Sequence, residues 1–96
     1  MRITPQEQHF IKNYWQNLLP NSMVYLFGSR ANDLKKGGDI DLLILNTDDI
    51  KISEKINFLS AFMLAFQEQK IDIVTYTYKQ DAPFKNIALS TAVPLL

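Results

Sequence analysis

Residues 23–45 read MVYLFGSRANDLKKGGDIDLLIL, and this stretch decides the fold. The run Met23–Phe27 is short, apolar and rich in aromatic residues, and a glycine follows it, which is typical of a buried strand. Residues 29–31 predict a short helical turn, and the polar residues 32–38, ending in two glycines, predict a loop. The second apolar run, 40–45, predicts a second buried strand.

A helix is predicted before this stretch. Thr4 can cap the free amides of the first turn, and Glu7, three residues later, completes a capping box. Pro5 suits the first helical position because its missing N–H would have no partner there. The helix is expected to end at Pro20-Asn21. Its apolar residues recur at helical spacing, and they are expected to be buried: Phe10, Ile11, Tyr14, Trp15 and Leu18.

Two further helices and a strand are predicted after residue 45. The next apolar residues step by four, three, four and three, which predicts a long helix ending near Gln69: Ile52, Ile56, Leu59, Met63 and Phe66. Residues 71–76 predict a third strand. Asp81 can cap a last short helix that ends at Pro94. Its inward-facing residues are expected to be Phe84, Ile87 and Ala88.

The predicted order is helix, strand, loop, strand, helix, strand, helix. Strands that alternate with helices indicate an α/β (α+β) fold with a small mixed β-sheet. We expect the helices mainly on one face of the sheet. The connection between the second and third strands holds a whole helix, so these strands can be parallel or separated in the sheet. The 96 residues predict one domain, 1–96, with one modest core.

Composition excludes several classes of function. Ten Lys and Arg balance ten Asp and Glu, so nucleic acid is not the expected partner, although a local basic patch stays possible. The absence of cysteine excludes disulfides, thiolate catalysis and cysteine-zinc sites. The only histidine, His9, has no evident catalytic partner and is expected at the surface. No apolar run is long enough to span a bilayer and no secretory signal is evident, so we expect a cytoplasmic domain.

Asp39 and Asp41 stand two residues apart at the start of the second predicted strand. Side chains alternate across a strand, so both carboxylates project from one face. Two like charges on a half-buried surface repel each other and lose hydration, and a cation between them removes that cost. Carboxylate oxygens suit Mg²⁺ or Mn²⁺. In the alternative interpretation, both aspartates are solvated residues at the edge of the loop.

Asp72 is a third carboxylate embedded in a predicted strand. If the second and third strands are neighbours, Asp72 joins Asp39 and Asp41 in one acidic cluster, on the open side of the sheet. Three carboxylates can hold two divalent ions roughly 3.5–4 Å apart, the arrangement that supports in-line phosphoryl or nucleotidyl transfer. Alternatively, Asp72 caps the preceding helix or pairs with Lys70.

Gly28 and Ser29 follow the first predicted strand and open a turn. Glycine lets a backbone approach a phosphate closely, free amides attract anions, and the Ser29 hydroxyl adds a donor. Arg30 adds positive charge, so the three residues predict a nucleoside triphosphate site beside the carboxylates. Alternatively, Arg30 pairs with a local carboxylate. Lys35 and Lys36 are expected to form a solvated loop face.

The order Gly28-Ser29, nine intervening residues and Asp39-Ile40-Asp41, with a later strand carboxylate at Asp72, resembles the signature of the nucleotidyltransferase superfamily. This superfamily includes DNA polymerase β, kanamycin nucleotidyltransferase and the minimal nucleotidyltransferases. The chain departs from it at Gly38, where minimal members often carry a small polar residue, and in loop 32–38, which carries lysines instead of arginines.

The resemblance implies that residues 1–96 form a single minimal nucleotidyltransferase domain. By resemblance, Asp39 and Asp41 bind the metals, Asp72 completes the metal site and helps to activate the acceptor hydroxyl, and Gly28 and Ser29 hold the triphosphate. The implied reaction is the Mg²⁺-dependent (or Mn²⁺-dependent) transfer of a nucleoside monophosphate, AMP from ATP, to a hydroxyl.

The resemblance also implies a partner. Minimal nucleotidyltransferases often act with a helical HEPN protein as a toxin–antitoxin pair, in which the nucleotidyltransferase is the antitoxin and can adenylylate a tyrosine of the toxin. A domain of this size has no room for a separate acceptor-binding domain, which agrees with an acceptor on another chain. In the alternative hypothesis, the chain is a non-catalytic binding module that neutralises a helical partner by forming a complex.

Overall fold

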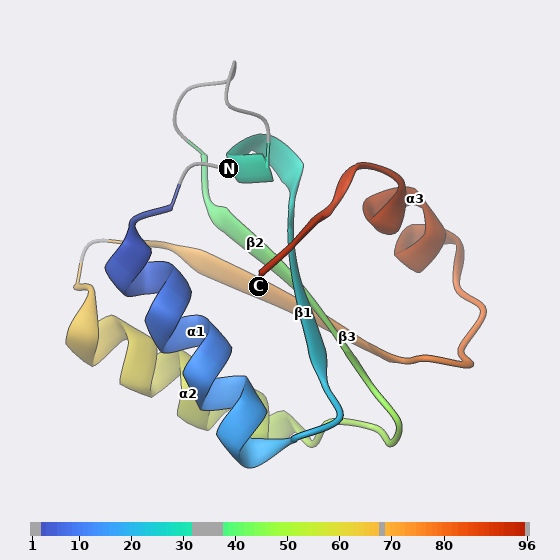
Figure 1. Cartoon of the computed structure of the whole chain (residues 1–96), viewed down its shortest axis with the longest axis horizontal. Helices are drawn as coiled ribbons and strands as arrows, with labels where there is room; N and C mark the ends of the chain where they lie inside the picture. The colour runs from blue at the N-terminus through green and yellow to red at the C-terminus, as the bar shows by residue number, and fades with distance from the viewer. Residues whose placement is uncertain (1–2, 32–37, 68, 96) are drawn as a thin grey trace.

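Four strands form one sheet in the order β3-β2-β1-β4 (Figure 1). The computed structural model describes residues 3–31, 38–67 and 69–95. The chain runs through its elements in the following order: α1 (Pro5–Leu18), β1 (Met23–Phe27), the 3₁₀ turn η1 (Gly28–Ala31), β2 (Ile40–Asn46), α2 (Ile52–Ala65), β3 (Ile71–Thr77), α3 (Pro83–Thr91) and β4 (Val93–Pro94). In the described part of the chain, no helix is long and apolar enough to cross a membrane.

The sheet is mixed, as predicted. β1 runs antiparallel to β2 and β4, whereas β2 and β3 are parallel neighbours joined through α2. Of the two arrangements left open by the sequence, the structure therefore adopts the parallel one. The two-residue strand β4 was not predicted, and it pairs only with Tyr25 and Leu26 of β1.

The predicted start of α1 is confirmed. The Glu7 amide donates to Oγ1 of Thr4 at 3.0 Å, and the Thr4 amide donates to Oε1 of Glu7 at 2.8 Å, which closes the capping box. The centre of the buried face lies at Ile11 and Trp15, which are fully buried. Leu18, expected in the core, is exposed at the last turn of the helix.

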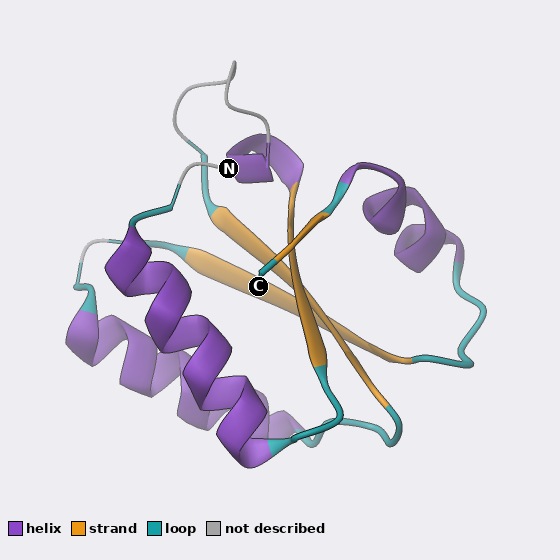
Figure 2. Ribbon diagram, viewed as in Figure 1, coloured by secondary structure: helices purple, strands orange, loops and turns teal. Residues whose placement is uncertain are grey.

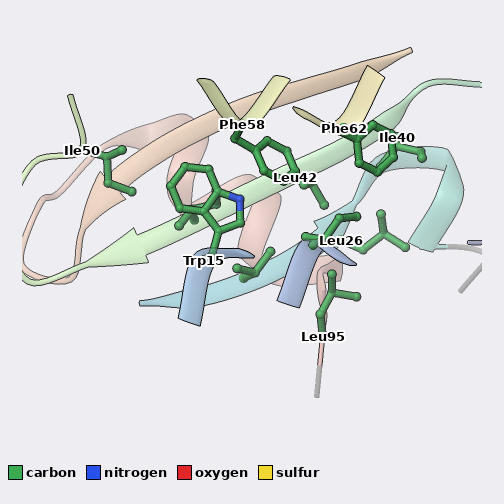
Figure 3. Close-up of a cluster of buried hydrophobic side chains, with 11 residues drawn as sticks. Trp15, Leu26, Ile40, Leu42, Ile50, Phe58, Phe62 and Leu95 are labelled. Carbon is green, nitrogen blue, oxygen red and sulfur yellow. The ribbon is translucent and has the colours of Figure 1, made fainter. Parts of the chain in front are cut away.

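Each face of the sheet carries its own core. Alternate residues of β2 point to opposite faces, so Ile40, Leu42 and Ile44 pack under α1 and α2, whereas Leu43 and Leu45 pack with α3. The larger core joins α1, α2 and the strands β1, β2 and β3 around Trp15 (Figure 3). Figure 2 shows α1 and α2 side by side and α3 away from them. The two long helices therefore share one face, as expected.

Only part of the apolar row that predicts α2 in the sequence is even half-buried in the structure. Phe58 and Phe62 are fully buried, while Ile52, Ile56 and Met63 are exposed, and the helix ends at Ala65 rather than near Gln69. Aromatic contacts with α1 explain why Phe58 and Phe62 face the core. The rings of Tyr14 and Phe58 have centroids 5.1 Å apart, and those of Phe10 and Phe62 are 5.9 Å apart. These pairs pack edge to face, a favoured arrangement of aromatic rings.

Two predictions about the last helix are wrong. Its N-cap residue is Ala82 rather than Asp81, which instead accepts a hydrogen bond from the side-chain Nδ2 of Asn86 at 3.3 Å. Phe84 and Ile87 are exposed, and Lys85 is buried beside Ala88. Nζ of Lys85 donates to the carbonyls of the turn after β3, at Thr77 (3.1 Å), Tyr78 (2.9 Å) and Gln80 (2.7 Å). These bonds make burial of the ammonium tolerable, because a buried charge needs hydrogen-bond partners.

Candidate active site

Asp41 and Asp72 lie directly opposite each other on β2 and β3, in the same row as Phe27 on β1. By strand alternation, both aspartates face away from α1 and α2. Asp72 lies inside β3, and α2 ends at Ala65, so the alternative in which Asp72 caps that helix is wrong. Two carboxylates from separate strands thus meet on the side of the sheet that the long helices leave open.

Asp39 precedes β2 by one residue and is exposed to solvent. It stands two positions before Asp41, on the same side of the chain. Asp39 therefore sits at the loop edge, as the alternative interpretation has it, whereas Asp41 is a half-buried residue of the strand. A backbone hydrogen bond joins the beginning of β2 to the beginning of β3, because the Ile40 amide donates to the Lys70 carbonyl at 2.9 Å.

The electrostatics of the cluster centre on Asp41. Burial raises the pKa of the Asp41 carboxyl, and the neighbouring charges of Asp72 and Asp39 raise it further. Negative charge at the cluster is therefore unfavourable in the chain alone. A bound cation would relieve both the loss of hydration and the repulsion, so the donor chemistry fits a hard divalent ion.

Gly28 lies against Asp41. Its φ is +71°, a backbone conformation that residues with a side chain rarely adopt. A Cβ added to Gly28 would collide with Oδ2 of Asp41 and would lie 3.3 Å from its Cγ. The sequence predicts a glycine here for approach to a phosphate, and the structure adds the Asp41 carboxylate as a second reason. Ser29 follows in η1, which contacts the start of β2 (Figure 1).

Arg30 joins the two loops that lead into the acidic strands. Its Nε donates to the carbonyl oxygen of Gly38 at 3.1 Å, and its Nη2 donates to Oε1 of Gln69 at 3.1 Å. Gly38 immediately precedes Asp39, and Gln69 stands three residues before Asp72. Gln69 was not singled out in the sequence, because nothing in its local pattern distinguishes it from other polar loop residues.

A groove of about 350 Å³ opens at the edge of the sheet, where the start of β3 meets α2, and Asp41 is not part of its lining. Asp39 and Asp72 line one side of it, and Leu59 and Met63 of α2 provide an apolar wall. Gln69, Lys70 and Ile71 complete the lining. Sequence analysis placed Leu59 and Met63 on a helix stripe without connecting them to the site, because only tertiary packing brings α2 beside the start of β3.

The described side chains form no preformed metal site. Within 3–31, 38–67 and 69–95, no group of three or more His, Cys, Asp or Glu side chains is arranged to hold a metal ion. His9 is exposed and shares a 2.8 Å hydrogen bond with Asn13, in agreement with its expected surface role. Lys35 and Lys36 lie outside the described residues.

Comparison with known families places most of the chain in one of them. The family described as "Polymerase beta, Nucleotidyltransferase" matches residues 9–96, which is most of the chain and includes every candidate site residue named above. Among curated proteins, no relative of this sequence is found.

Several solved structures have a similar fold, and they include toxin–antitoxin structures. One is the tri-AMPylated Shewanella oneidensis HEPN toxin in complex with its MNT antitoxin, with a TM-score of 0.68, 17% identity and coverage of 95% of this chain and 70% of the other. A toxin–antitoxin structure with AMP-PNP has a TM-score of 0.71 and 17% identity, and covers 93% and 72%. A third, from Shewanella oneidensis, has a TM-score of 0.70 and 14% identity, and covers 98% and 72%. At these identities the likeness establishes the fold.

Proposed function

Because this chain belongs to the polymerase beta nucleotidyltransferase family, we propose that it transfers AMP from ATP to a hydroxyl group on a partner protein, with Mg²⁺ or Mn²⁺ as cofactor. One observation carries the proposal: Asp41 and Asp72 are in register on adjacent parallel strands, with Asp39 and Gly28 beside them. This placement supports a site in which triphosphate and acceptor meet over three carboxylates.

The carboxylates take different roles in this proposal. Asp39 and Asp41, which follow the loop after Gly28, hold the metal bound to the triphosphate. Asp72 comes from the neighbouring strand, after α2, which places it on the acceptor side. There it would hold a second divalent ion and accept the proton of the incoming hydroxyl. When bound, the divalent ion would neutralise phosphate charge and orient the reacting oxygens.

The bond changes follow from these positions. The acceptor oxygen attacks the α-phosphorus of ATP in line with the leaving group, and the bond to the oxygen that bridges the α- and β-phosphates breaks. Pyrophosphate leaves, and AMP stays on the acceptor oxygen. Gly28 and Ser29 bind the triphosphate through the turn after β1. Arg30 supplies positive charge there and ties the Gly38 and Gln69 loops in place.

We propose a HEPN-type helical protein as the acceptor, encoded by a neighbouring gene, so that the chain acts as the antitoxin of a cytoplasmic toxin–antitoxin pair. Support comes from the fold, which is shared with the MNT antitoxin in a complex whose HEPN toxin is tri-AMPylated. A toxin–antitoxin structure of the same fold contains AMP-PNP, an ATP analogue, which agrees with ATP as the donor.

The test is label transfer. We would incubate the chain with Mg²⁺ and ATP labelled at the α-phosphate, with and without the HEPN-type protein, and add EDTA to a parallel sample. Label on the partner that depends on Mg²⁺ supports the proposal. Tight binding without label would support instead a non-catalytic binding module.

A matched pair of variants assigns the activity to the site. The double variant Asp39→Asn/Asp41→Asn is expected to abolish transfer. The double variant Asp48→Asn/Asp49→Asn removes the same charge from an exposed turn beyond the other end of β2, and it is expected to keep wild-type transfer. Equal loss in both variants would show that total charge, rather than the acidic cluster, governs the activity.

A further inference from the structure

A row of large apolar side chains on α2 faces solvent. Ile52 is 70% exposed, and Ile56 and Met63 are each 55% exposed, while Leu59 between them is half-buried. We call these four residues the α2 seam. The core takes the other side of the helix through Phe58 and Phe62, so the seam is not needed to hold α2 on the sheet.

The spacing of the seam is specific. Its residues step by four, three and four, which is the 3.5-residue period of the contact positions in paired helices. From Ile52 to Met63 the row extends about 16 Å, or three helical turns. A straight apolar row with this period fits the apolar face of another α-helix, whose anchor residues recur at the same intervals.

The seam continues into the candidate active site. Leu59 and Met63 belong to the seam and also form the apolar wall of the groove that Asp39 and Asp72 line. A helix lying along α2 would therefore have one end beside Asp72, the carboxylate assigned to the acceptor. The far end of the seam, at Ile52, lies about three turns from the groove.

We propose that the α2 seam binds one amphipathic helix of the protein acceptor and thereby brings the acceptor hydroxyl to Asp72. This inference rests on the proposed function and adds the docking surface and the secondary structure of the substrate. A second copy of the chain is the less suitable occupant, because seam-to-seam packing would cover the groove of both copies and exclude the acceptor.

The experiment compares two charge insertions on the same helix. Ile56→Glu places a carboxylate in the seam but outside the groove. Leu64→Glu is the matched control, because Leu64 is 81% exposed on α2 and belongs neither to the seam nor to the groove lining. Binding of each variant to the purified HEPN-type protein is measured by calorimetry without ATP, and thermal melting by circular dichroism checks that both variants fold.

The expected result is a rise of about tenfold or more in the Kd of Ile56→Glu for the acceptor protein, as at buried interface positions, with the Kd of Leu64→Glu unchanged. At saturating acceptor, label transfer by Ile56→Glu should recover towards the wild-type rate, because the carboxylates are intact. Metal-dependent binding of ATP to the chain alone should be equal in both variants.

Three outcomes would overturn the inference: equal Kd values for both variants, no binding of the acceptor by the wild-type chain, or a wild-type dimer in analytical ultracentrifugation that Ile56→Glu dissociates. Failure of the proposed function looks different. In that case the wild-type chain binds the acceptor through the seam, and Ile56→Glu weakens that complex, but no label is transferred.

Discussion

The Asp41 carboxylate fills the space that a side chain at residue 28 would occupy, so the position of Asp41 requires glycine at residue 28. The pair joins two parts of the site, the turn after β1 and the acidic strand β2. A substitution at Gly28 therefore changes the position of Asp41 as well as the backbone of the turn.

Gly28→Ala is expected to abolish transfer and to destabilise the fold. The positive φ alone costs about 1–3 kcal/mol for a residue with a side chain. The collision with Oδ2 of Asp41 adds to that cost. The measurement is a double-mutant cycle of melting temperature with Asp41→Ala, which removes the carboxylate and should restore part of the lost stability. Gly38→Ala, at φ +85°, serves as the control for backbone strain alone. Additive effects in the cycle would contradict a clash between the alanine side chain at residue 28 and the Asp41 carboxylate.

Asp41→Asn is expected to raise the melting temperature at neutral pH in EDTA while abolishing transfer. Burial and the charges of Asp72 and Asp39 raise the pKa of Asp41 in the folded chain. The stability that this carboxyl contributes is therefore present below the ordinary pKa of about 4 and is lost as pH rises through the raised value. The advantage of Asn over Asp should shrink as the pH is lowered towards 4. Asp48→Asn, in an exposed turn, is the control and should show no such pH-dependent gain.

Asp72→Asn is expected to lower kcat by about 10²-fold or more, with little change in nucleotide affinity. In the proposed function Asp72 stands on the acceptor side, and a group used mainly in the transition state affects the rate more than ground-state binding. Single-turnover transfer gives the rate, and calorimetry with Mg²⁺ and a non-hydrolysable ATP analogue gives the affinity. Transfer at the wild-type rate would leave Asp39 and Asp41 as the whole of the acidic site.

Nucleotide affinity is expected to depend on the divalent ion, because the described carboxylates do not form a closed shell of three ligands. Mg²⁺ in such sites is shared between one or two carboxylates and the substrate phosphates. The chain alone should therefore bind Mg²⁺ or Mn²⁺ weakly, and more tightly with ATP. Titration of ATP in Mg²⁺ and in EDTA tests this, and equal affinities would count against the acidic cluster as the metal site.

Lys85→Met is expected to lower stability by about 1–3 kcal/mol, because three backbone carbonyls of the turn after β3 lose their donor. Each kcal/mol corresponds to about 4–8 °C in melting temperature for a domain of this size. Lys79→Met, at an exposed position of the same turn, removes equal charge and should change the melting temperature little. Similar losses in both variants would show that the buried bonds of Lys85 contribute nothing specific.

Residues close together in the sequence determined where the helices and strands form. The Thr4–Glu7 capping box depends on residues three apart, and the structure forms it as predicted. The apolar runs of β1, β2 and β3 were also located from the sequence, because a short run of large apolar residues bounded by glycine or polar residues is typical of a buried strand. The candidate residues at positions 28–30, 39, 41 and 72 were all named from spacing and residue type.

Packing between distant segments decided the rest. The rotation of α2 about its axis depends on contacts with Phe10 and Tyr14 of another helix. Its own apolar periodicity therefore did not identify Phe58 and Phe62 as its buried residues. The parallel pairing that sets Asp41 opposite Asp72 and the contact of Arg30 with Gln69 join residues more than thirty positions apart. No local pattern encodes such pairs, because their energy exists only once the whole chain is packed. The sequence alone thus identified the candidate side chains, and the tertiary structure decided where they meet and which surface stays exposed beside them.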